Sequence, residues 1–195
     1  MAAYAQAMLN RLYNSWVYGA FLMSLVLVVL SPIYTPTWNR VQLLTFFSLL
    51  IYIFHQYEEH DGDRFRIFVN QILADGREAL TKANVFWINV IYVWVLLAIV
   101  NLAVHCVAPG WAVAASYLLL VNALAHIGQA IVMRRPNPGV YTSIIFFVPL
   151  GSWLLVTAWP MATFTQQVVS FAAVIALHAH IVLLALSHKR KLGVK

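Results

Sequence analysis

Long apolar runs separated by short polar stretches dominate the pattern of the chain. Runs such as FLMSLVLVVL and YVWVLLAIV are apolar on every side, which is typical of helices buried in lipid rather than of barrel strands. A membrane-spanning helix needs about 20 apolar residues. Six segments reach that length, at about 14–34, 40–59, 84–107, 111–133, 139–159 and 165–188. The pattern predicts an all-α integral membrane bundle of six transmembrane helices, forming a single domain over 1–195.

The connection at about 60–83 is longer than the others and has a different pattern. Over about 63–76 its apolar residues recur at helical spacing on one face, with polar residues on the other. The apolar face comprises Phe65, Phe68, Val69, Ile72 and Leu73. This pattern is typical of a cytoplasmic interfacial amphipathic helix, and also of a loop helix packed on the bundle. In either arrangement the helix would cover the cytoplasmic end of the second span.

The composition excludes an ordinary soluble domain, because 63% of the 195 residues are hydrophobic and the mean hydropathy is +0.80. The net charge of +6 does not indicate nucleic-acid binding, since the basic residues mark one side of a membrane. The predicted outer connections carry only Arg40. The other Lys and Arg residues lie at the termini and inner connections: Arg11, Arg64, Arg66, Arg77, Lys82, Arg134, Arg135, Lys189, Arg190, Lys191 and Lys195. By the positive-inside rule, we expect an integral inner (cytoplasmic) membrane protein with N- and C-termini in the cytoplasm.

Acidic residues are concentrated in one stretch, HQYEEHDGDR at 55–64, which follows the uncharged run VQLLTFFSLLIYIF. His55, Glu58 and Glu59 are spaced i, i+3, i+4 and therefore share one face of the second span. An ionisable group facing lipid costs on the order of 3 kcal/mol even on a lenient insertion scale. This face is therefore expected to point into the bundle or into a water-filled cavity.

Histidines from three predicted spans reach a similar depth. At about 1.5 Å per residue from the outer end of each span, four of them fall in the cytoplasmic half of the hydrocarbon core: His55, His126, His178 and His180. Asn122 shares a helix face with His126. A single buried histidine is more often an interhelical hydrogen-bonding group than a ligand, but four histidines and two glutamates at one depth favour a functional site. We therefore predict that the second, fourth and sixth spans contribute one polar cluster.

Three kinds of chemistry use such a cluster. Imidazole and carboxylate bind zinc or non-haem iron, and helical bundles build such sites from inward-facing Glu and His. Metal-free acid–base catalysis needs only a buried carboxylate and a histidine, and a proton or cation relay in a transporter uses the same groups. Cys106 is the only cysteine, which excludes a thiolate-built metal site. The chain has no P-loop or dinucleotide fingerprint, so no nucleotide cofactor is expected.

At HQYEE the chain resembles the HXXEE-motif family of small multi-span bacterial membrane proteins, which is named for those residues. The segments NALAHIGQAI and PGVYTSIIFFVPLG are similar to a second block of that family, so the resemblance spans roughly 50–150. The resemblance names no reaction. It implies a shared site formed by His55, Glu58, Glu59, Asn122 and His126. It further implies that Asn122, Tyr141 and Thr142 orient a ligand or bind substrate.

A weaker similarity is to CAAX-type intramembrane proteases, which combine a Glu-Glu pair, an arginine shortly after it and histidines on two later helices. The chain has acids and histidines in that order: Glu58, Glu59, His126 and His180. It departs from the pattern at Arg64, which comes one residue late, and at Leu184, which replaces an asparagine. This similarity implies a glutamate that activates water beside two histidines.

Together these features predict a membrane-embedded enzyme, hydrolase-like or acid–base, that acts on a lipid-like or prenyl-like hydrophobic small molecule entering between helices. The expected cofactor is zinc, with iron as the alternative. The expected metal ligands are His55, Glu59, His126, and His178 or His180. Glu58 and Glu59 are the candidate catalytic carboxylates, with Glu58 either a free base or the group that orients a histidine. The alternative function is a small ion-coupled transporter that uses the cluster as a cation or proton site. Membrane lipids are the expected partners, and nucleic acid is not.

Overall fold

The computed structural model describes residues 2–193, and Lys195, one of the basic residues named above, lies outside this range. Within the range the chain is helical and contains no strand. The long single helices are α1 (Ala2–Tyr34), α2 (Arg40–His60), α6 (Val113–Met133) and α9 (Phe164–Lys191). Two further helices are composite, each with a π-helical segment: α4 (Lys82–Trp87), η2 (Ile88–Trp94) and α5 (Val95–Cys106); and α7 (Val140–Thr142), η4 (Ser143–Phe147) and α8 (Val148–Ala158). The shorter α3 is Arg64–Ala74, and 3-10 turns occupy Asp61–Asp63 (η1), Pro109–Ala112 (η3) and Trp159–Met161 (η5).

Five helical segments are long and apolar enough to cross a membrane, as an integral membrane protein requires. They are Tyr4–Tyr34, Lys82–Cys106, Pro109–Met133, Val140–Met161 and Phe164–Lys191. The prediction of six spans is thus confirmed for five of them. The predicted second span, α2, is not among the five, because its last turns are polar from His55 onwards. It nevertheless lies inside the bundle, in contact with α1, α5, α6 and α8.

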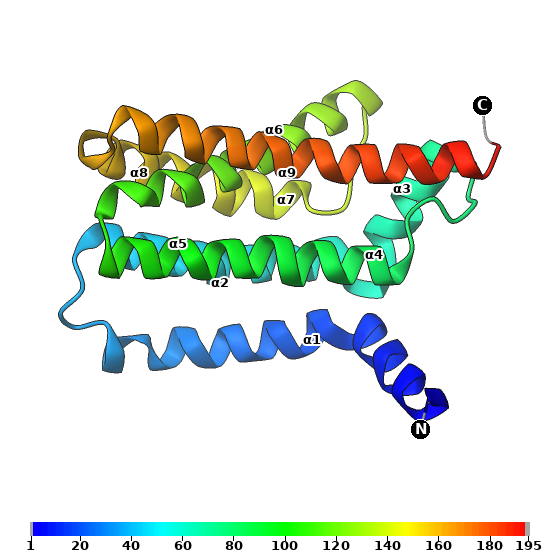
Figure 1. The fold of residues 1–195 in the computed structure, drawn as a ribbon, viewed down its shortest axis with the longest axis horizontal. Coiled ribbons are helices and arrows are strands. Elements are labelled where there is room, and N and C mark those ends of the chain that lie inside the picture. Colours follow the sequence, from blue (N-terminus) through cyan, green and yellow to red (C-terminus); the bar gives the residue numbers. More distant parts are fainter. Residues whose placement is uncertain (1, 194–195) are drawn as a thin grey trace.

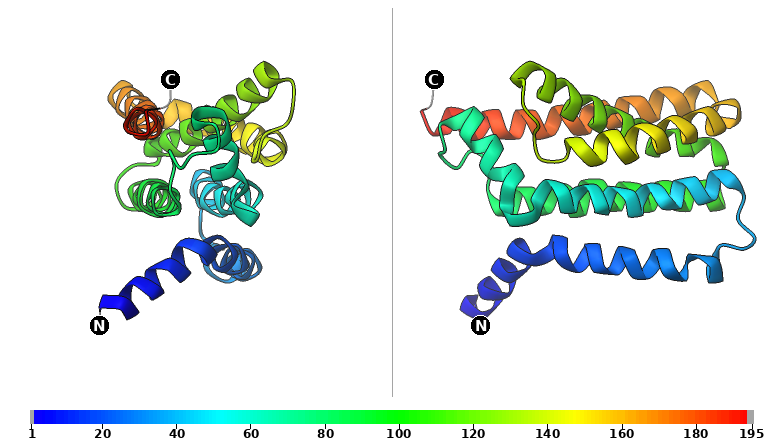
Figure 2. Two further views of the ribbon diagram at one scale, coloured as in Figure 1. Left: turned by 90° about the vertical axis from the view of Figure 1, so that its right-hand side faces the viewer. Right: turned by 180° about the vertical axis from the view of Figure 1, so that it is seen from behind.

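The helices form three layers, which Figures 1 and 2 show from three directions. α1 is one outer layer and packs on α2; α2 and the α4–α5 helix form the middle layer; α6, α8 and α9 form the other outer layer. α1 begins and α9 ends at the same end of the bundle, whereas the loop between α1 and α2 lies at the opposite end (Figure 1).

The main core lies between the middle layer and the layer of α6, α8 and α9. Its fully buried side chains include Leu97, Leu118, Leu119, Phe147 and Leu154. Large apolar side chains on the outer surface are exposed, such as Val29 on α1 and Val156 on α8, as lipid-facing residues would be. Buried histidine and glutamate side chains gather where α2 meets α3, which is where the candidate site lies.

The predicted amphipathic helix is α3, and its apolar side packs on the bundle. Phe65 and Val69 contact a small buried cluster of Leu80, Val85 and Ile88. Asn70 ties α3 to the following loop through two hydrogen bonds with the backbone of Leu80, at 3.0 and 2.7 Å. Of the two arrangements that the sequence allows, the packed helix is therefore present, while contact of α3 with a membrane surface stays a prediction.

Both π-helical segments lie beside the polar end of α2. Pro149 has no N–H group, so a regular helix would leave the carbonyl four residues before it without a partner, and η4 widens the backbone there. Phe147 of η4 is fully buried, with its ring centroid 4.3 Å from that of His55. In η2, Asn89 accepts a hydrogen bond of 2.8 Å from the buried amide of Gln56 on α2. The irregular turns thus place side chains against the candidate site.

Candidate metal centre

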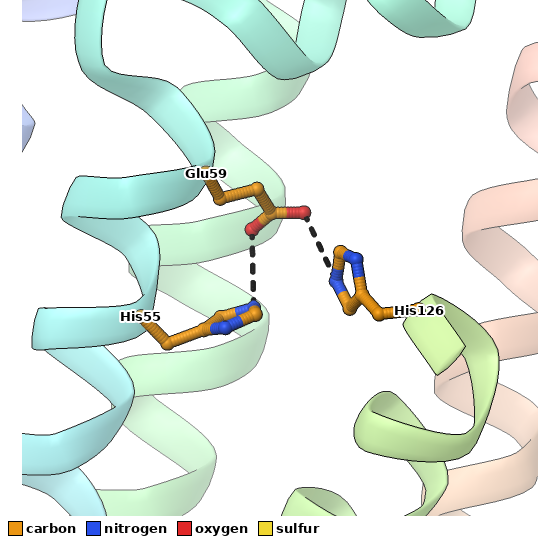
Figure 3. A group of neighbouring side chains, drawn as sticks. All are labelled: His55, Glu59 and His126. Carbon is orange, nitrogen blue, oxygen red and sulfur yellow. Dashed lines mark ion pairs between the residues drawn. The ribbon is translucent and has the colours of Figure 1, made fainter. Parts of the chain in front are cut away.

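Two histidines and one glutamate converge between α2 and α6. His55 and Glu59 lie one turn apart on α2 and are both buried, and His126 faces them from α6 (Figure 3). Nε2 of His55 lies 3.6 Å from Oε2 of Glu59, and Nε2 of His126 lies 3.5 Å from Oε1. One ligand atom from each of the three residues lies within 4.8 Å of the other two. Because these side chains are held on two packed helices, they form a site before any ligand arrives.

Thr142 determines which nitrogen of His55 carries the proton. Nδ1 of His55 lies 2.9 Å from Oγ1 of Thr142. The hydroxyl proton of Thr142 is donated to Oε2 of Glu58, so the hydroxyl oxygen accepts from His55. On these partners Nδ1 of His55 is assigned the proton, and Nε2, which faces Glu59, has a free lone pair.

Asn137 has the same effect on His126. Its Nδ2 donates to the backbone carbonyl of His126 at 2.8 Å, and this turns Oδ1 towards Nδ1 of the same histidine, 3.0 Å away. An amide oxygen only accepts, so Nδ1 of His126 is the protonated nitrogen and Nε2 presents its lone pair to Glu59. Asn137 is 3% exposed and belongs to the turn between α6 and α7. This turn therefore orients a histidine of the helix that precedes it.

Gly139, in the same turn, lets the backbone approach both imidazole rings. Its φ of 96° lies in a region that side chains rarely adopt. A Cβ atom at this position would lie 2.8 Å from Cε1 of both His55 and His126. Glycine is therefore required for the rings to keep their present positions, with centroids 4.9 Å apart.

Glu58 binds the start of the α7–α8 helix and is not a free base. Its Oε1 accepts from the backbone N–H groups of Gly139 and Tyr141, each at 3.2 Å. Its Oε2 accepts from the backbone N–H of Thr142 at 2.7 Å and from the hydroxyl of that residue. A carboxylate at this place pairs N–H groups that have no partner within the helix and is favoured by the helix dipole. Of the two roles predicted for Glu58, the geometry supports orientation of His55, through Thr142.

The centre thus consists of three lone-pair donors: Nε2 of His55, Nε2 of His126 and the carboxylate of Glu59. Neither Nε2 atom is assigned a proton that it could donate to the carboxylate. An N–H···O hydrogen bond spans about 2.7–3.2 Å, and the N···O distances of 3.6 and 3.5 Å exceed this range. Acceptors packed in this way repel one another unless a proton or a metal ion lies between them. Two ligand atoms of one tetrahedral zinc ion are separated by about 3.3 Å, given Zn–N and Zn–O distances near 2.0 Å. Both histidine–carboxylate distances are close to this value, although they run to different oxygens of Glu59, and the three ligand atoms as a set lie within 4.8 Å, so the site would close slightly around a shared metal ion.

A cavity of ≈370 Å³ adjoins the centre, between α3, the α4–η2 segment, α6 and α9. Glu59 and His126 lie at its polar end. His178 also lines it from α9, with Nδ1 bonded to the carbonyl of Val174 at 2.9 Å. His178 is therefore close enough to belong to the same pocket but is not one of the three converging residues.

The predicted ligand His180 lies away from the centre. It is exposed, and its ring packs on Tyr92 with centroids 5.5 Å apart. Two residues along a helix is a rotation of about 200°, so His178 and His180 cannot both face the bundle. The arrangement of two acids and two histidines implied by the similarity to CAAX-type proteases is therefore not assembled, and His180 is removed as a ligand.

Two residues of the second motif block have different surroundings from Thr142. Asn122 lines the cavity and donates through Nδ2 to the hydroxyl of Tyr52 at 2.9 Å. Tyr141 is 60% exposed, and its bond to Glu58 uses only its backbone N–H.

Sequence reasoning missed His60, which is buried with Nε2 3.1 Å from Oε2 of Glu59. Its ring lies between Trp16 and Phe65, at centroid distances of 5.3 and 5.5 Å. The spacing i, i+5 places His60 on a different helix face from His55, but a direct neighbour of Glu59 can still reach its flexible carboxylate. The position of His60 next to Glu59 in the sequence could therefore have identified it. For Asn137 and Gly139 the sequence indicates only a turn.

Comparison with known proteins identifies the family. The family described as "Protein of unknown function with HXXEE motif" matches residues 46–154, more than half of the chain, and the chain belongs to it. No curated protein and no solved structure matches the chain. The matched range contains His55, Glu59 and His126 together with the turn that orients them, so the whole candidate centre lies in the part of the chain that defines the family.

Proposed function

We propose that this HXXEE-family protein is a membrane-embedded, metal-dependent enzyme that acts on a lipid-like substrate. The observation that carries the proposal is the convergence of three lone-pair donors, two of them histidine nitrogens whose opposite ring nitrogens are held as donors by Thr142 and Asn137. Ligating histidines in metalloproteins are oriented in the same way, by a partner on the other ring nitrogen.

The ligand set supports zinc, with iron as the alternative. Two imidazoles and one carboxylate are typical of catalytic zinc sites and of non-haem iron sites. Calcium and magnesium need more oxygen ligands than Glu59 offers. Three protein ligands leave a fourth position for water or substrate, which distinguishes catalytic from structural zinc sites. His178, which lines the same cavity, is our candidate to occupy or border that position.

The chemistry follows from the position of the centre at one end of an apolar cavity. A bound zinc or iron ion would polarise a substrate oxygen and make a bound water more acidic. The chain's own groups direct the Nε2 lone pairs of the two imidazoles towards Glu59 and bury all three side chains away from bulk water. This combination supports a hydrolase-like or acid–base reaction on a hydrophobic molecule.

Ion-coupled transport is the second candidate, and one observation favours it. His60 lines both the apolar cavity and a separate polar pocket of ≈260 Å³ that Asn14, Asp63 and Lys82 also line. A cation moving from this pocket to Glu59 would pass His60. Flux of labelled zinc into proteoliposomes distinguishes the two candidates, because an enzyme centre retains its ion whereas a transporter releases it on the other side.

Metal analysis of the purified protein tests the proposal. We expect about one zinc or iron ion per chain, lost in Glu59→Gln and in the double variant His55→Ala, His126→Ala. His105→Ala is the matched control, since His105 lies near the far end of the bundle with Nδ1 bonded to the carbonyl of Asn101. Circular dichroism of each variant shows whether the helices are intact. Stoichiometric metal in the folded double variant would overturn the proposal.

A further inference from the structure

We propose that the cavity binds an uncharged, single-chain lipid whose head group carries an oxygen that accepts a hydrogen bond from Tyr52. The inference specifies the substrate class of the metal centre, and for the position of the head group it rests on the function proposed above. It is carried by the shape of the cavity, by the charges along its wall and by one buried hydroxyl group.

The body of the cavity is apolar and open on one side. Its walls are mainly aliphatic side chains of α3, the α4–η2 segment and α9, such as Leu73, Ile88 and Ile181. Three lining residues are also exposed on the outer surface: Ile72, Ala125 and Val182. They belong to α3, α6 and α9, so the opening lies among these helices on an apolar face. An alkyl or prenyl chain can therefore enter from the membrane side.

The size of the cavity suits one chain. Binding sites for small ligands typically have volumes of about 300–1,000 Å³, and the value of ≈370 Å³ is near the lower limit. A lipid with two acyl chains would have to leave one chain outside. Tyr52 and Glu59 line the cavity from α2 and His126 lines it from α6, so we place the head of the ligand at the metal centre and its tail towards the aliphatic side chains of α3 and α9.

The wall offers no lysine or arginine to an anionic head group, and His60, His126 and His178 are its only basic side chains. None of the residues that line the cavity, all within the described range, is Lys or Arg, and Glu59 is the only carboxylate among them. A phosphate or sulfate would therefore be buried without the full positive charge of a lysine or arginine beside it, which is costly. A cationic head would compete with the metal ion for Glu59. An uncharged head avoids both costs.

Tyr52 supplies the polar contact. It is 3% exposed, lines the cavity, and has its ring packed on Phe147 and His55 at centroid distances of 4.9 and 5.7 Å. With the amide of Asn122 assigned as it is, the hydroxyl oxygen accepts from Nδ2, and the hydroxyl proton has no acceptor among the described residues. A buried donor without an acceptor is unfavourable. An alcohol, ester or amide oxygen of the ligand would satisfy it beside the metal centre.

Photolabelling of the full chain in lipid nanodiscs tests this assignment. The probe is tetradecanol with a diazirine in its tail, and the labelled peptides are identified by mass spectrometry. We expect labelling of α3, α6 and α9, with tetradecanol competing at about tenfold lower concentration than tetradecyl phosphate, since the phosphate would be buried without a lysine or arginine partner. Competition by the phosphate at equal or lower concentration would overturn the proposal.

Two pairs of variants locate the contacts. Tyr52→Phe is expected to weaken competition by tetradecanol about fivefold, the effect of one neutral hydrogen bond, and to leave competition by tetradecane unchanged. Tyr117→Phe is the control, because the hydroxyl of Tyr117 donates to Gln167 and neither residue lines the cavity. Val182→Trp at the opening should block labelling, whereas Val156→Trp, at an exposed site on α8, should not. Unchanged labelling in Val182→Trp, or unchanged competition in Tyr52→Phe, would count against the assignment.

The two proposals fail separately. Glu59→Gln removes a metal ligand but leaves the apolar wall, so tail labelling should persist in this variant. Wild-type protein without stoichiometric metal but with the expected labelling would overturn the metal-dependent function alone. Metal retention without preference for the uncharged head would overturn the substrate assignment alone.

Discussion

Replacing Gly139 by alanine tests whether the turn between α6 and α7 holds the two imidazoles in place. The added Cβ would lie 2.8 Å from a ring carbon of both His55 and His126. Carbon atoms in contact pack at about 3.5–4.0 Å, so each ring would have to retreat by roughly 0.7 Å. Metal–ligand distances tolerate only about 0.2 Å. The φ of 96° adds strain for alanine of roughly 1–3 kcal/mol.

We therefore expect Gly139→Ala to lower zinc affinity on the order of 100-fold, which corresponds to about 2.7 kcal/mol, because two ligands are displaced together. The measurement is competition against a chromophoric zinc chelator with detergent-purified protein, with helix content checked by circular dichroism. Gly128→Ala on α6 is the control, since no heavy atom lies within 4 Å of its added Cβ and alanine is the better helix former. Wild-type zinc affinity in a folded Gly139→Ala protein would refute the idea that this turn positions the ligands.

Three further substitutions test the groups around the ligands. Asn137→Leu should reduce zinc affinity about 10–100-fold in the same chelator assay, because Nδ1 of His126 loses its acceptor, and an unchanged affinity would contradict that role. Thr142→Val should weaken zinc binding about tenfold and Thr142→Ser should restore it, whereas equal loss in both variants would indicate packing rather than the hydroxyl. Glu58→Gln should weaken the hydrogen bonds to the start of α7 and so lower the midpoint temperature of thermal unfolding, by about 2–4 °C for each kcal/mol of unfolding free energy lost. A midpoint equal to that of the wild type would argue against the helix-capping role.

The sequence by itself determined the class of fold and the part of the site that lies on α2, namely His55 and Glu59. Apolar runs of spanning length predict helices locally, and five of the six predicted spans are long and apolar enough in the structure. The spacing of His55 and Glu59 is also local, because residues four apart on a helix share a face. His126 was predicted from its depth and from the family resemblance, and it lies opposite both residues.

Only the tertiary structure separated residues that look equivalent in the sequence. Glu58 and Glu59 are neighbours, yet one binds the start of α7 and the other faces His126. His178 and His180 are two apart, yet only His178 lines the cavity. Each choice depends on how a helix is rotated about its axis when it packs, and a rotation of about 100° per residue sends adjacent side chains to different neighbours.

The turn between α6 and α7 was beyond the reach of local patterns. Its proline and glycine residues predict a break between helices, but its docking against His55 and His126 joins segments far apart along the chain. Asn137 and Gly139 acquire their roles only when α2, α6 and α7 are packed together. The sequence by itself determined that His55, Glu59 and His126 lie near one another, whereas long-range packing excluded His180, added His60 and decided the orientation of the groups, because lone pairs and protons are directed by partners from other helices.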